Sequence, residues 1–434
     1  MILWKGVISL VIHTVQRGDT IYSIATRYGI PMQKVIDDNQ LENPERLVVG
    51  QTIVVITDNI NHTVTPGQSL YSIARNYHTT VSAILIANPE ITDPARIHVG
   101  QVIVIPAAEP KLGTIDVNGY AFPNINSNTL ANTLPHLTYI SIFSYQVRPD
   151  GSLAPIQDTP VIQSARQQRV APLMVITNIK EGASFDSALA HTILTNEQVQ
   201  NTLFDNIIKT LGKGYYGLDI DFEYLYPSDR ENYSRFVKKA VDTLHPLGYT
   251  VTIALAPKTS SGQVGLLYEA HDYPALGALV DHVILMTYEW GYTYSPARAV
   301  APVDLVEKVL QYAVSVIPSK KILMGIPNYG YDWTLPFVQG SSARSLSHTA
   351  AVSLALRVNA QIHYDTTAQS PFFRYYDTNR RQHEVWFEDA RSIQAKLKLV
   401  NQYNLGGVSY WTINSFFPQN WLVIESMYNV RKVL

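Results

Sequence analysis

The segment from Gly214 to Tyr224, which reads GYYGLDIDFEY, decides what kind of domain the chain builds. Its acids, Asp219, Asp221 and Glu223, stand at every second position and alternate with apolar residues. Successive side chains of a β-strand point to opposite faces, so a strand places all three carboxyl groups on one face, whereas a helix would spread them around its axis. The segment therefore predicts a strand that gathers acids on one side.

These three carboxyl groups cannot all be ionised, because like charges at about 4–6 Å and burial both disfavour the charged form. We expect Asp219 and Asp221 to titrate as a coupled pair, and the outermost acid, Glu223, to keep a proton near neutral pH and act as a general acid. A calcium or magnesium site is the alternative, although such loops usually add glycine turns and carbonyl ligands. We expect no bound metal and no cofactor.

Around this strand, residues 113–434 alternate between strand-like and helix-like segments, which is typical of a parallel α/β domain. No glycine-rich phosphate loop follows the first strand, so the pattern favours a (β/α)8 TIM barrel over an open sheet. The expected barrel strands are Thr114–Tyr120, Tyr139–Ser144, Ala171–Thr177, Tyr216–Asp221, Thr250–Leu255, His282–Thr287, Lys321–Ile326 and Gly407–Trp411. Strand-like pieces at Gln361–Tyr364, Phe372–Tyr376 and Glu384–Phe387 predict a small α+β insertion within about residues 331–400 on the upper rim.

The beginning of the chain contains a repeat. The run from His13 to Ala25 returns from His62 to Ala74, and Gly50-Gln51 returns as Gly100-Gln101. Each copy predicts strand, helix, helix and strand, with a turn and an N-cap before the first helix and an Asn that stops the second. We expect two βααβ modules, at residues 12–57 and 61–106, and a linker at residues 107–112.

The composition of the chain limits the classes of molecule that we expect it to bind. With 33 Lys+Arg against 35 Asp+Glu, the net charge of −2 offers no attractive field for nucleic acid or an anionic membrane, and we expect neither partner. The absence of Cys excludes disulfides and thiolate sites, and 27 tyrosines suit a surface that binds sugars. The apolar start, Met1–Ile12, lacks a basic leader and a small-residue cleavage site, so we expect no signal peptide.

The repeat resembles the LysM domain. The resemblance rests on the turn at Gly18-Asp19, the run from Tyr22 to Ala25, the mid-module Asn39 and the closing Gly50-Gln51, and the second copy matches the pattern as well. LysM domains bind glycans that contain N-acetylglucosamine, so the resemblance implies an anchor on cell wall or chitin. The alternative is that the modules are inert spacers.

The acidic strand from Tyr216 to Glu223 resembles the D-x-x-D-x-D-x-E strand of glycoside hydrolase family 18, the chitinase-like retaining enzymes. Three further segments follow in the family's order. Met286–Glu289 is similar to its M-x-Y-D, Gly325–Gly330 to its G-x-P-x-Y-G, and Trp411 to the Trp that ends its eighth strand. The resemblance spans residues 113–434.

The resemblance implies a role for each matched residue. Glu223 is the acid/base, Asp221 steadies and polarises the substrate's acetamido group, and Asp219 tunes Asp221. Tyr288 hydrogen-bonds the acetamide carbonyl, and Trp411 forms the floor of the −1 sugar subsite. The further substrate-binding residues are expected to be Met286, Glu289 and Tyr329, while Tyr329, Trp290 and Trp333 either line a glycan cleft or fill the rim.

The arrangement of the acids also bears on the mechanism. Carboxyl groups on one strand approach a glycosidic bond from the same side and flank it poorly, whereas attack by the substrate's own 2-acetamido oxygen needs only one acid and one orienting group. The chain departs from the family pattern twice, with Tyr216 in place of the first acid and Glu289 in place of Asp. Tyr216 lies outside the spacing of the acids, so we expect it to affect strand support, and the longer Glu289 to shift sugar contacts.

Two LysM modules joined to such a barrel resemble the cortex-lytic and spore-germination N-acetylglucosaminidases of spore-forming bacteria. This implies a monomeric, retaining, substrate-assisted hydrolase of spore-cortex peptidoglycan, made in the mother cell without a signal peptide and deposited in the spore coat or cortex. A chitinase or an endo-N-acetylglucosaminidase is one alternative. A non-catalytic glycan-binding lectin is another, although lectins of this kind usually lose the acid that is present here as Glu223.

Overall fold

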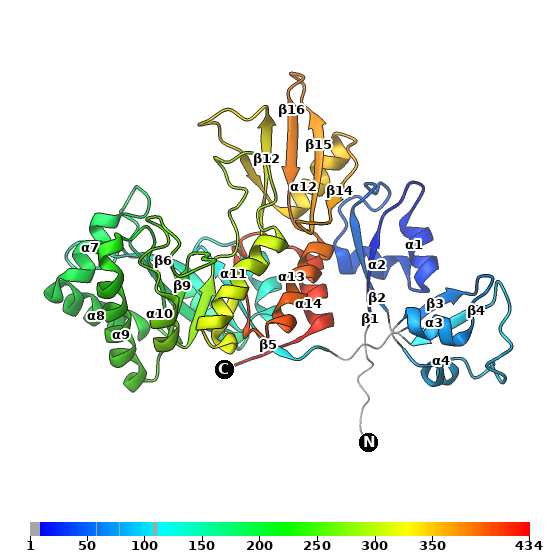
Figure 1. The fold of residues 1–434 in the computed structure, drawn as a ribbon, viewed down its shortest axis with the longest axis horizontal. Coiled ribbons are helices and arrows are strands. Elements are labelled where there is room, and N and C mark those ends of the chain that lie inside the picture. The colour runs from blue at the N-terminus through cyan, green and yellow to red at the C-terminus, as the bar shows by residue number, and fades with distance from the viewer. Residues whose placement is uncertain (1–8, 58, 78, 107–110) are drawn as a thin grey trace.

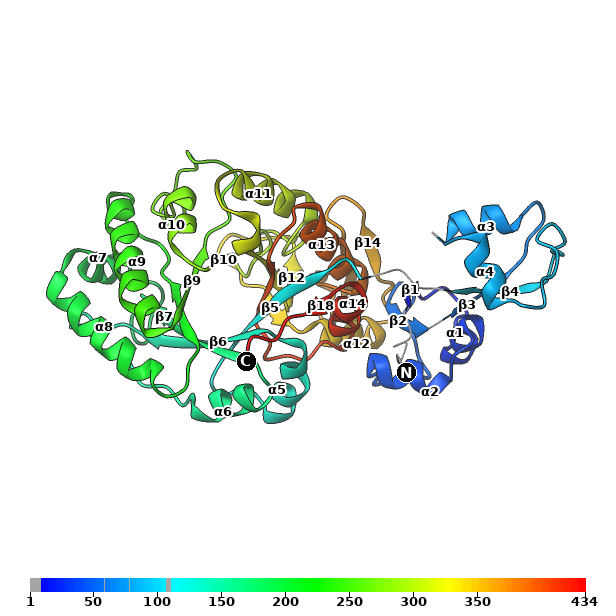
Figure 2. The ribbon, with the colours of Figure 1, turned by 90° about the horizontal axis from the view of Figure 1, so that it is seen from below.

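The computed structural model describes residues 9–57, 59–77, 79–106 and 111–434. Two small modules, a barrel and an insertion make up these residues, and the second module lies at the end of the molecule farthest from the barrel (Figures 1 and 2). The expectations for residues 1–8 of the N-terminal stretch and for residues 107–110 of the linker fall outside the described residues. Within the described part, no helix is both long and apolar enough to span a bilayer.

Parallel strands close into the predicted barrel. Neighbours in sequence are neighbours in the sheet, and the last strand pairs with the first, so the prediction of a (β/α)8 barrel is confirmed. The barrel strands are β5 (Thr114–Ala121), β6 (Tyr139–Gln146), β7 (Ala171–Thr177), β8 (Gly217–Asp221), β9 (Thr250–Leu255), β10 (His282–Leu285), β11 (Ile322–Pro327) and β17 (Gly407–Trp411). A short β18 (Asn429–Val430), which the sequence analysis did not predict, pairs with β5.

Helices surround this barrel. They are α5 (Ser127–Thr133), α6 (Thr159–Gln167), α7 (Ser187–Thr195), α8 (Glu197–Leu211), α9 (Arg230–Leu244), α10 (Tyr273–Leu279), α11 (Val303–Val316), α13 (Ala390–Gln402) and α14 (Pro418–Met427). The apolar residues of β8, such as Leu218 and Ile220, pack outward into the large core that these helices share. The alternating acids of β8 therefore point into the barrel.

Strand β10 is shorter than predicted. It ends at Leu285 rather than Thr287, because the backbone N–H groups of Thr287 and Tyr288 bond back to Leu285 O and Met286 O in successive tight turns. The Thr287 hydroxyl then donates to Gly325 O on the adjacent strand β11, at 2.7 Å. These turns direct the segment that follows β10 over the barrel mouth.

The insertion forms its own antiparallel sheet with strand order β13-β12-β16-β15-β14. It comprises β12 (Gly330–Leu335), β13 (Arg344–Leu346), α12 (His348–Arg357), β14 (His363–Asp365), β15 (Ser370–Tyr376) and β16 (Gln382–Trp386). It stands beside the first module (Figure 1). Val48 of that module shares an apolar cluster with Leu354, Ile362 and Phe373, so the insertion and the module bury a common surface.

The two N-terminal modules have the predicted βααβ order. Module 1 comprises β1 (Ser9–Thr14), α1 (Ile21–Tyr28), α2 (Met32–Asn39) and β2 (Thr52–Thr57), and module 2 comprises β3 (Asn59–Thr63), α3 (Leu70–Asn76), α4 (Val81–Ala87) and β4 (Val102–Pro106). Thr20 caps α1 and Ser69 caps α3, each in a capping box. Asn39 is the last residue of α2, and its amide bonds both the N–H and the C=O of Val54, which ties that helix to β2.

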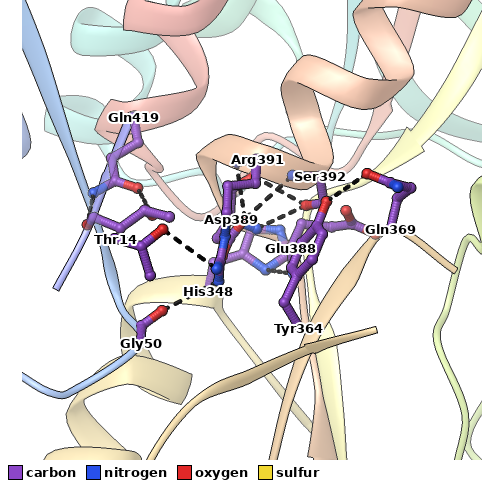
Figure 3. Close-up of polar contacts among 11 residues, drawn as sticks. Thr14, Gly50, His348, Tyr364, Gln369, Glu388, Asp389, Arg391, Ser392 and Gln419 are labelled. Atoms are coloured by element: carbon purple, nitrogen blue, oxygen red, sulfur yellow. Dashed lines mark hydrogen bonds and ion pairs between the residues drawn. The ribbon is translucent and has the colours of Figure 1, made fainter. Parts of the chain in front are cut away.

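Module 1 docks on the outside of the barrel (Figure 3). Gln419 of α14 donates to Asn39 Oδ1 at 3.0 Å and to Thr52 O at 2.7 Å, and it accepts from the Thr52 hydroxyl at 2.7 Å. Arg391 of α13 donates to Gly50 O at 3.1 Å. All of these groups lie between module 1 and the barrel helices, so module 1 is held in one position by directional bonds.

Candidate active site

The acids of β8 face a cavity at the carboxyl end of the barrel. This cavity has a volume of about 420 Å³, and its lining includes Asp221, Glu223, Tyr288 and Trp411. Asp219 lies one layer deeper and has no exposed surface. The alternation read from the sequence therefore directs these acids to the end of the barrel where such folds place their chemistry.

Burial controls the protonation of the cluster. It raises the pKa of Asp219 to about 6, although the hydroxyls of Tyr120 and Ser141 favour the carboxylate, and Ser141 Oγ lies 3.0 Å from Asp219 Oδ2. Burial, then the charges of Glu223 and Asp219, raise the pKa of Asp221 well above its ordinary value. Burial and the charge of Glu289 raise the pKa of Glu223 to about 7. Glu223 is thus able to hold a proton at neutral pH.

The sequence analysis expected Asp219 and Asp221 to titrate as a coupled pair, but Asp221 interacts more strongly with Glu223 than with Asp219. The charge of Glu223 follows burial as a cause of the upward pKa shift of Asp221, ahead of the charge of Asp219. Asp221 Oδ1 is buried and has no hydrogen-bond partner among the described residues. Because Asp221 is buried next to Glu223, simultaneous ionisation of the two carboxyl groups is disfavoured, and states with one proton between them are favoured.

Two buried side chains from the βα units on either side of β8 hold the backbone under Glu223. The Asn178 amide donates to Glu223 O and accepts from Glu223 N, both at 2.9 Å. His271 accepts from the Ala256 N–H through Nδ1, so its Nε2 carries the proton and donates to Phe222 O at 3.0 Å. The sequence analysis missed both positioning residues. The available signal for Asn178 was a lone amide directly after the buried β7.

An aromatic floor supports the cavity. The ring of Trp411 lies 4.8 Å from that of Phe143 and 5.3 Å from that of Tyr120, between ring centroids, in edge-to-face contacts. Met286 lines the same cavity. Burial, followed by the charges of Asp221 and Glu223, raises the pKa of Tyr288 well above its usual range, so the hydroxyl of Tyr288 remains a hydrogen-bond donor.

Glu289 lies where two cavities meet. A second cavity of about 510 Å³ adjoins the first, and Glu289 and Trp411 line both. The hydroxyl of Tyr331 donates to Glu289 at 3.1 Å, and that of Tyr329 makes a still shorter contact. Burial raises the pKa of Glu289 above its ordinary value, and the two hydroxyls, which stabilise the carboxylate, offset only part of this rise. Tyr329 lines only the second cavity.

The other aromatic residues divide between cleft and core. Trp290 lines the first cavity, whereas Trp333 is 3% exposed and packs inside the insertion, so it fills the rim. Tyr216 packs against Tyr139 and the C-terminal Leu434, at the opposite end of the barrel from the acids. This position agrees with the expectation that Tyr216 affects strand support, which stays a prediction. Within the described residues, no group of three His, Asp or Glu side chains has the arrangement of a metal site.

Comparison with protein families fits this geometry. Residues 111–415, which include the barrel and the acid cluster, match the model for glycosyl hydrolases family 18. The chain belongs to this family. Residues 13–55 and 62–106 each match the LysM domain. The family 18 chain is thus a glycoside hydrolase, and both domain types point to a glycan that contains N-acetylglucosamine as the molecule it binds.

The similarity to two individual proteins extends over nearly the whole chain. A cortical fragment-lytic enzyme of Bacillus subtilis (strain 168) is 42% identical over 429 residues, which are 97% of this chain and 99% of the relative. The crystal structure of the spore cortex-lytic enzyme SleL from Bacillus megaterium QM B1551 has a TM-score of 0.90 and 40% identity, and the match covers 99% of this chain and 100% of that one. A chitinase from Chromobacterium violaceum matches over 72% of this chain, with 26% identity and a TM-score of 0.68.

Proposed function

We propose that this glycoside hydrolase cleaves N-acetylglucosamine linkages in peptidoglycan of the bacterial spore cortex, as a monomer located in the spore coat or cortex. Relatives named for cortex lysis match the chain from end to end, modules included. The observation that carries the chemistry is Glu223, a carboxyl with a pKa of about 7 at a cavity that also holds Asp221 and Tyr288.

The proposed reaction proceeds with retention of configuration. Glu223 protonates the glycosidic oxygen while the substrate's acetamide oxygen attacks the anomeric carbon and forms an oxazolinium ring. Asp221 accepts a hydrogen bond from the acetamide N–H, and the Tyr288 hydroxyl donates to its oxygen before attack. The Glu223 carboxylate then removes a proton from the water that opens the ring. Trp411 supports the sugar from below, and Asp219 acts through Asp221.

The test is Glu223→Gln. The variant keeps the shape of the side chain but has no proton to donate, so turnover of cortex fragments should fall by about 10²–10⁴-fold. Glu231→Gln is the matched control, because Glu231 is an exposed residue on the outside of α9. Retention on insoluble cortex should be the same for both variants. Hydrolysis by Glu223→Gln at the normal rate would contradict the assignment.

Product analysis separates the remaining alternatives. Mass spectrometry of fragments from purified cortex should show N-acetylglucosamine at the new reducing ends, joined to muramic-acid-containing chains. Release of chitobiose from chitin in preference to cortex fragments would favour the chitinase alternative, and release of intact glycans from glycoproteins would favour an endo-N-acetylglucosaminidase. Binding with no released sugar would favour the lectin alternative.

The pH profile provides a second readout. Protonated Glu223 is the active form, so kcat/KM should fall as the pH rises through about 7. The charge of Glu289 raises the pKa of Glu223, so Glu289→Gln should move this fall to lower pH. A fall that stays in place in this variant would show that the two carboxyl groups do not interact.

A further inference from the structure

The insertion supplies the hydrogen bonds that hold Glu289 in the active site. Tyr331 lies on β12, the first strand of the insertion, and Tyr329 directly precedes that strand. Both hydroxyls donate to the Glu289 carboxylate, and Tyr331 does so at 3.1 Å. The charge of Glu289 in turn raises the pKa of Glu223. The position of β12 therefore bears on the proton of the proposed acid.

The titratable side chains that face Glu289 come from three segments of the chain. They are Glu223 and Tyr224 after β8, Tyr288 beside Glu289, and Tyr329 and Tyr331 at the base of the insertion. Among the described residues, only the last two hydrogen-bond the Glu289 carboxylate. If they move away, the neutral form of Glu289 is favoured and its effect on Glu223 weakens.

A row of paired residues crosses the sheet of the insertion from β12 to the edge strand β14. Backbone pairing joins Tyr331 to Trp386, Trp386 to Phe372 and Phe372 to His363. The rings of Phe372 and Trp386 also stack, with 4.7 Å between their centroids. Since hydrogen bonds hold paired strands at a fixed spacing, the position of β14 bears on the position of Tyr331.

Module 1 is clamped to the edge of this sheet. The Ile362 N–H, directly before β14, donates to Val49 O at 2.9 Å, and Val48 shares an apolar cluster with Ile362. A Cβ added to Gly50 would lie 1.9 Å from Ile362 O, so the two backbones are in direct contact. On its other side, Gly50 O accepts from Arg391 of α13 at 3.1 Å (Figure 3). The turn at residues 48–50 is thus wedged between the insertion and a barrel helix.

We propose that module 1 is a positioning part of the catalytic unit. Its turn at residues 48–50 fixes the edge of the insertion sheet, and this sheet holds Tyr329 and Tyr331 on Glu289. Val48 and Gly50 are thus positioning residues that act on Glu223 through the insertion. The inference rests on the proposed function, because it concerns the group that we propose as the acid.

The experiment compares Gly50→Ala with Gly100→Ala in the full chain. The two glycines are equivalent and have φ values of 90° and 86°, so alanine introduces the same backbone strain in both modules. Only at Gly50 does the new Cβ also meet the insertion, since an added Cβ at Gly100 has nothing within 4 Å. The measurement is the pH profile of kcat/KM on soluble cortex fragments, which removes any effect of retention on insoluble cortex.

Gly50→Ala should move the fall of kcat/KM near pH 7 to lower pH by about 0.3 unit or more, a roughly twofold change in the acid dissociation constant of Glu223. The direction follows because Glu289 that has lost its two donors is more often neutral and raises the pKa of Glu223 less. Gly100→Ala should leave the fall in place. In a Glu289→Gln background, Gly50→Ala should add no further shift.

A second variant covers the case in which Gly50→Ala unfolds module 1. Module 2 has the exposed His98 at the position of Val48, so a polar residue is compatible with the fold of a module. Val48→Gln removes the apolar contact with the insertion, adds no titratable group and should move the fall in the same direction. In both variants the Ile362 amide should exchange its hydrogen faster, because its bond to Val49 O is weakened.

The outcomes separate this inference from the proposed function. A fall that stays in place in both Gly50→Ala and Val48→Gln, or a shift that persists in the Glu289→Gln background, would overturn the positioning role of module 1 and leave the proposed function intact. If the unsubstituted chain shows no fall near pH 7, the proposed role of Glu223 is overturned, and this inference with it.

Discussion

Val54 in module 1 and Val104 in module 2 stand at equivalent positions of the repeat, yet Val54 is fully buried and Val104 is partly exposed. Two positions earlier, the equivalent residues Thr52 and Val102 differ more in exposure, since Thr52 is 4% exposed and Val102 is 54% exposed. A Cβ added to Gly50 would lie 1.9 Å from Ile362 O, whereas one added to Gly100 would meet nothing within 4 Å. One face of the repeat is thus covered in module 1 and open in module 2.

The cores of the two modules do not differ in this way. Module 1 buries Val15, Ile21, Ile24, Ala25, Val35, Ile53 and Val55, and module 2 buries the equivalent Val64, Leu70, Ile73, Ala74, Ile84, Ile103 and Ile105. The fold of a module therefore follows from its own apolar residues. Its position depends on residues far away in the chain, such as Gln419 and Arg391, which bond to module 1 and, among the described residues, not to module 2.

The largest effect on stability is expected from a charged substitution in the face of module 1 that packs against the barrel. Val54→Asp places a carboxylate against the barrel core with no partner, and it should lower the free energy of unfolding by about 3 kcal/mol or more. Val104→Asp in module 2 is the matched control and should change it by less than about 1 kcal/mol. Scanning calorimetry of the two full-length variants measures the difference. Equal effects would show that docking adds nothing to the stability of module 1.

A smaller effect is expected from removing one of the hydrogen bonds that hold module 1 against the barrel. Thr52→Val gives module 1 the residue that module 2 has at this position, and Gln419→Ala removes the partner on α14. The two substitutions should show a coupling energy of about 1 kcal/mol in denaturant unfolding, because they remove the same bond. The reverse exchange in module 2, Val102→Thr, should have almost no effect. Strictly additive single effects would contradict the proposed coupling.

The smallest effect on stability is expected at acidic pH. In module 1, His13 faces Asp19 at 3.0 Å, and module 2 has Gln68 at this position. The Gln16 N–H, and then His13 and Arg27, hold the pKa of Asp19 below its ordinary value against the opposing effect of burial. An acid with a lowered pKa stabilises the fold above its unfolded pKa, and this contribution is lost as the pH falls through the folded value.

Module 1 should therefore lose a little stability between about pH 5 and pH 3, and Asp19→Gln should remove this loss. Hydrogen-exchange protection of the Ile53 amide, with the Ile103 amide of module 2 as the internal reference, measures it. Protection that falls equally in both modules and in the variant would rule out Asp19 as the cause.

Much of the fold was predictable because its elements depend on local patterns. Strands β7, β9 and β17 begin and end where predicted, since each is a short apolar run between turn signals. Helix α12 of the insertion was not placed, although an α+β insertion was expected. Its buried residues include Ala351 and Leu354, which pack against Val48 of module 1, and no local pattern reveals a partner so distant.

The candidate site also contains features that local sequence patterns predict and features that they do not. The alternation of Asp219, Asp221 and Glu223 was readable because a strand has a fixed period of two. The contacts of Asn178 and His271 with residues 222–223 were not readable, because each comes from a different βα unit. That Glu289 lines both cavities also became visible only when distant segments were brought together.

The sequence by itself determined the closed barrel, the two βααβ modules and the acid-bearing face of β8, because periodicity, capping and apolar runs act over a few residues. Only the tertiary structure decided that module 1 is fixed to the barrel while the described part of module 2 is not, and that Glu289 joins the acids of β8. Docking and pKa shifts depend on burial and on short distances between groups that lie hundreds of positions apart, as in the bond from Gln419 to Thr52. No local pattern encodes such distances.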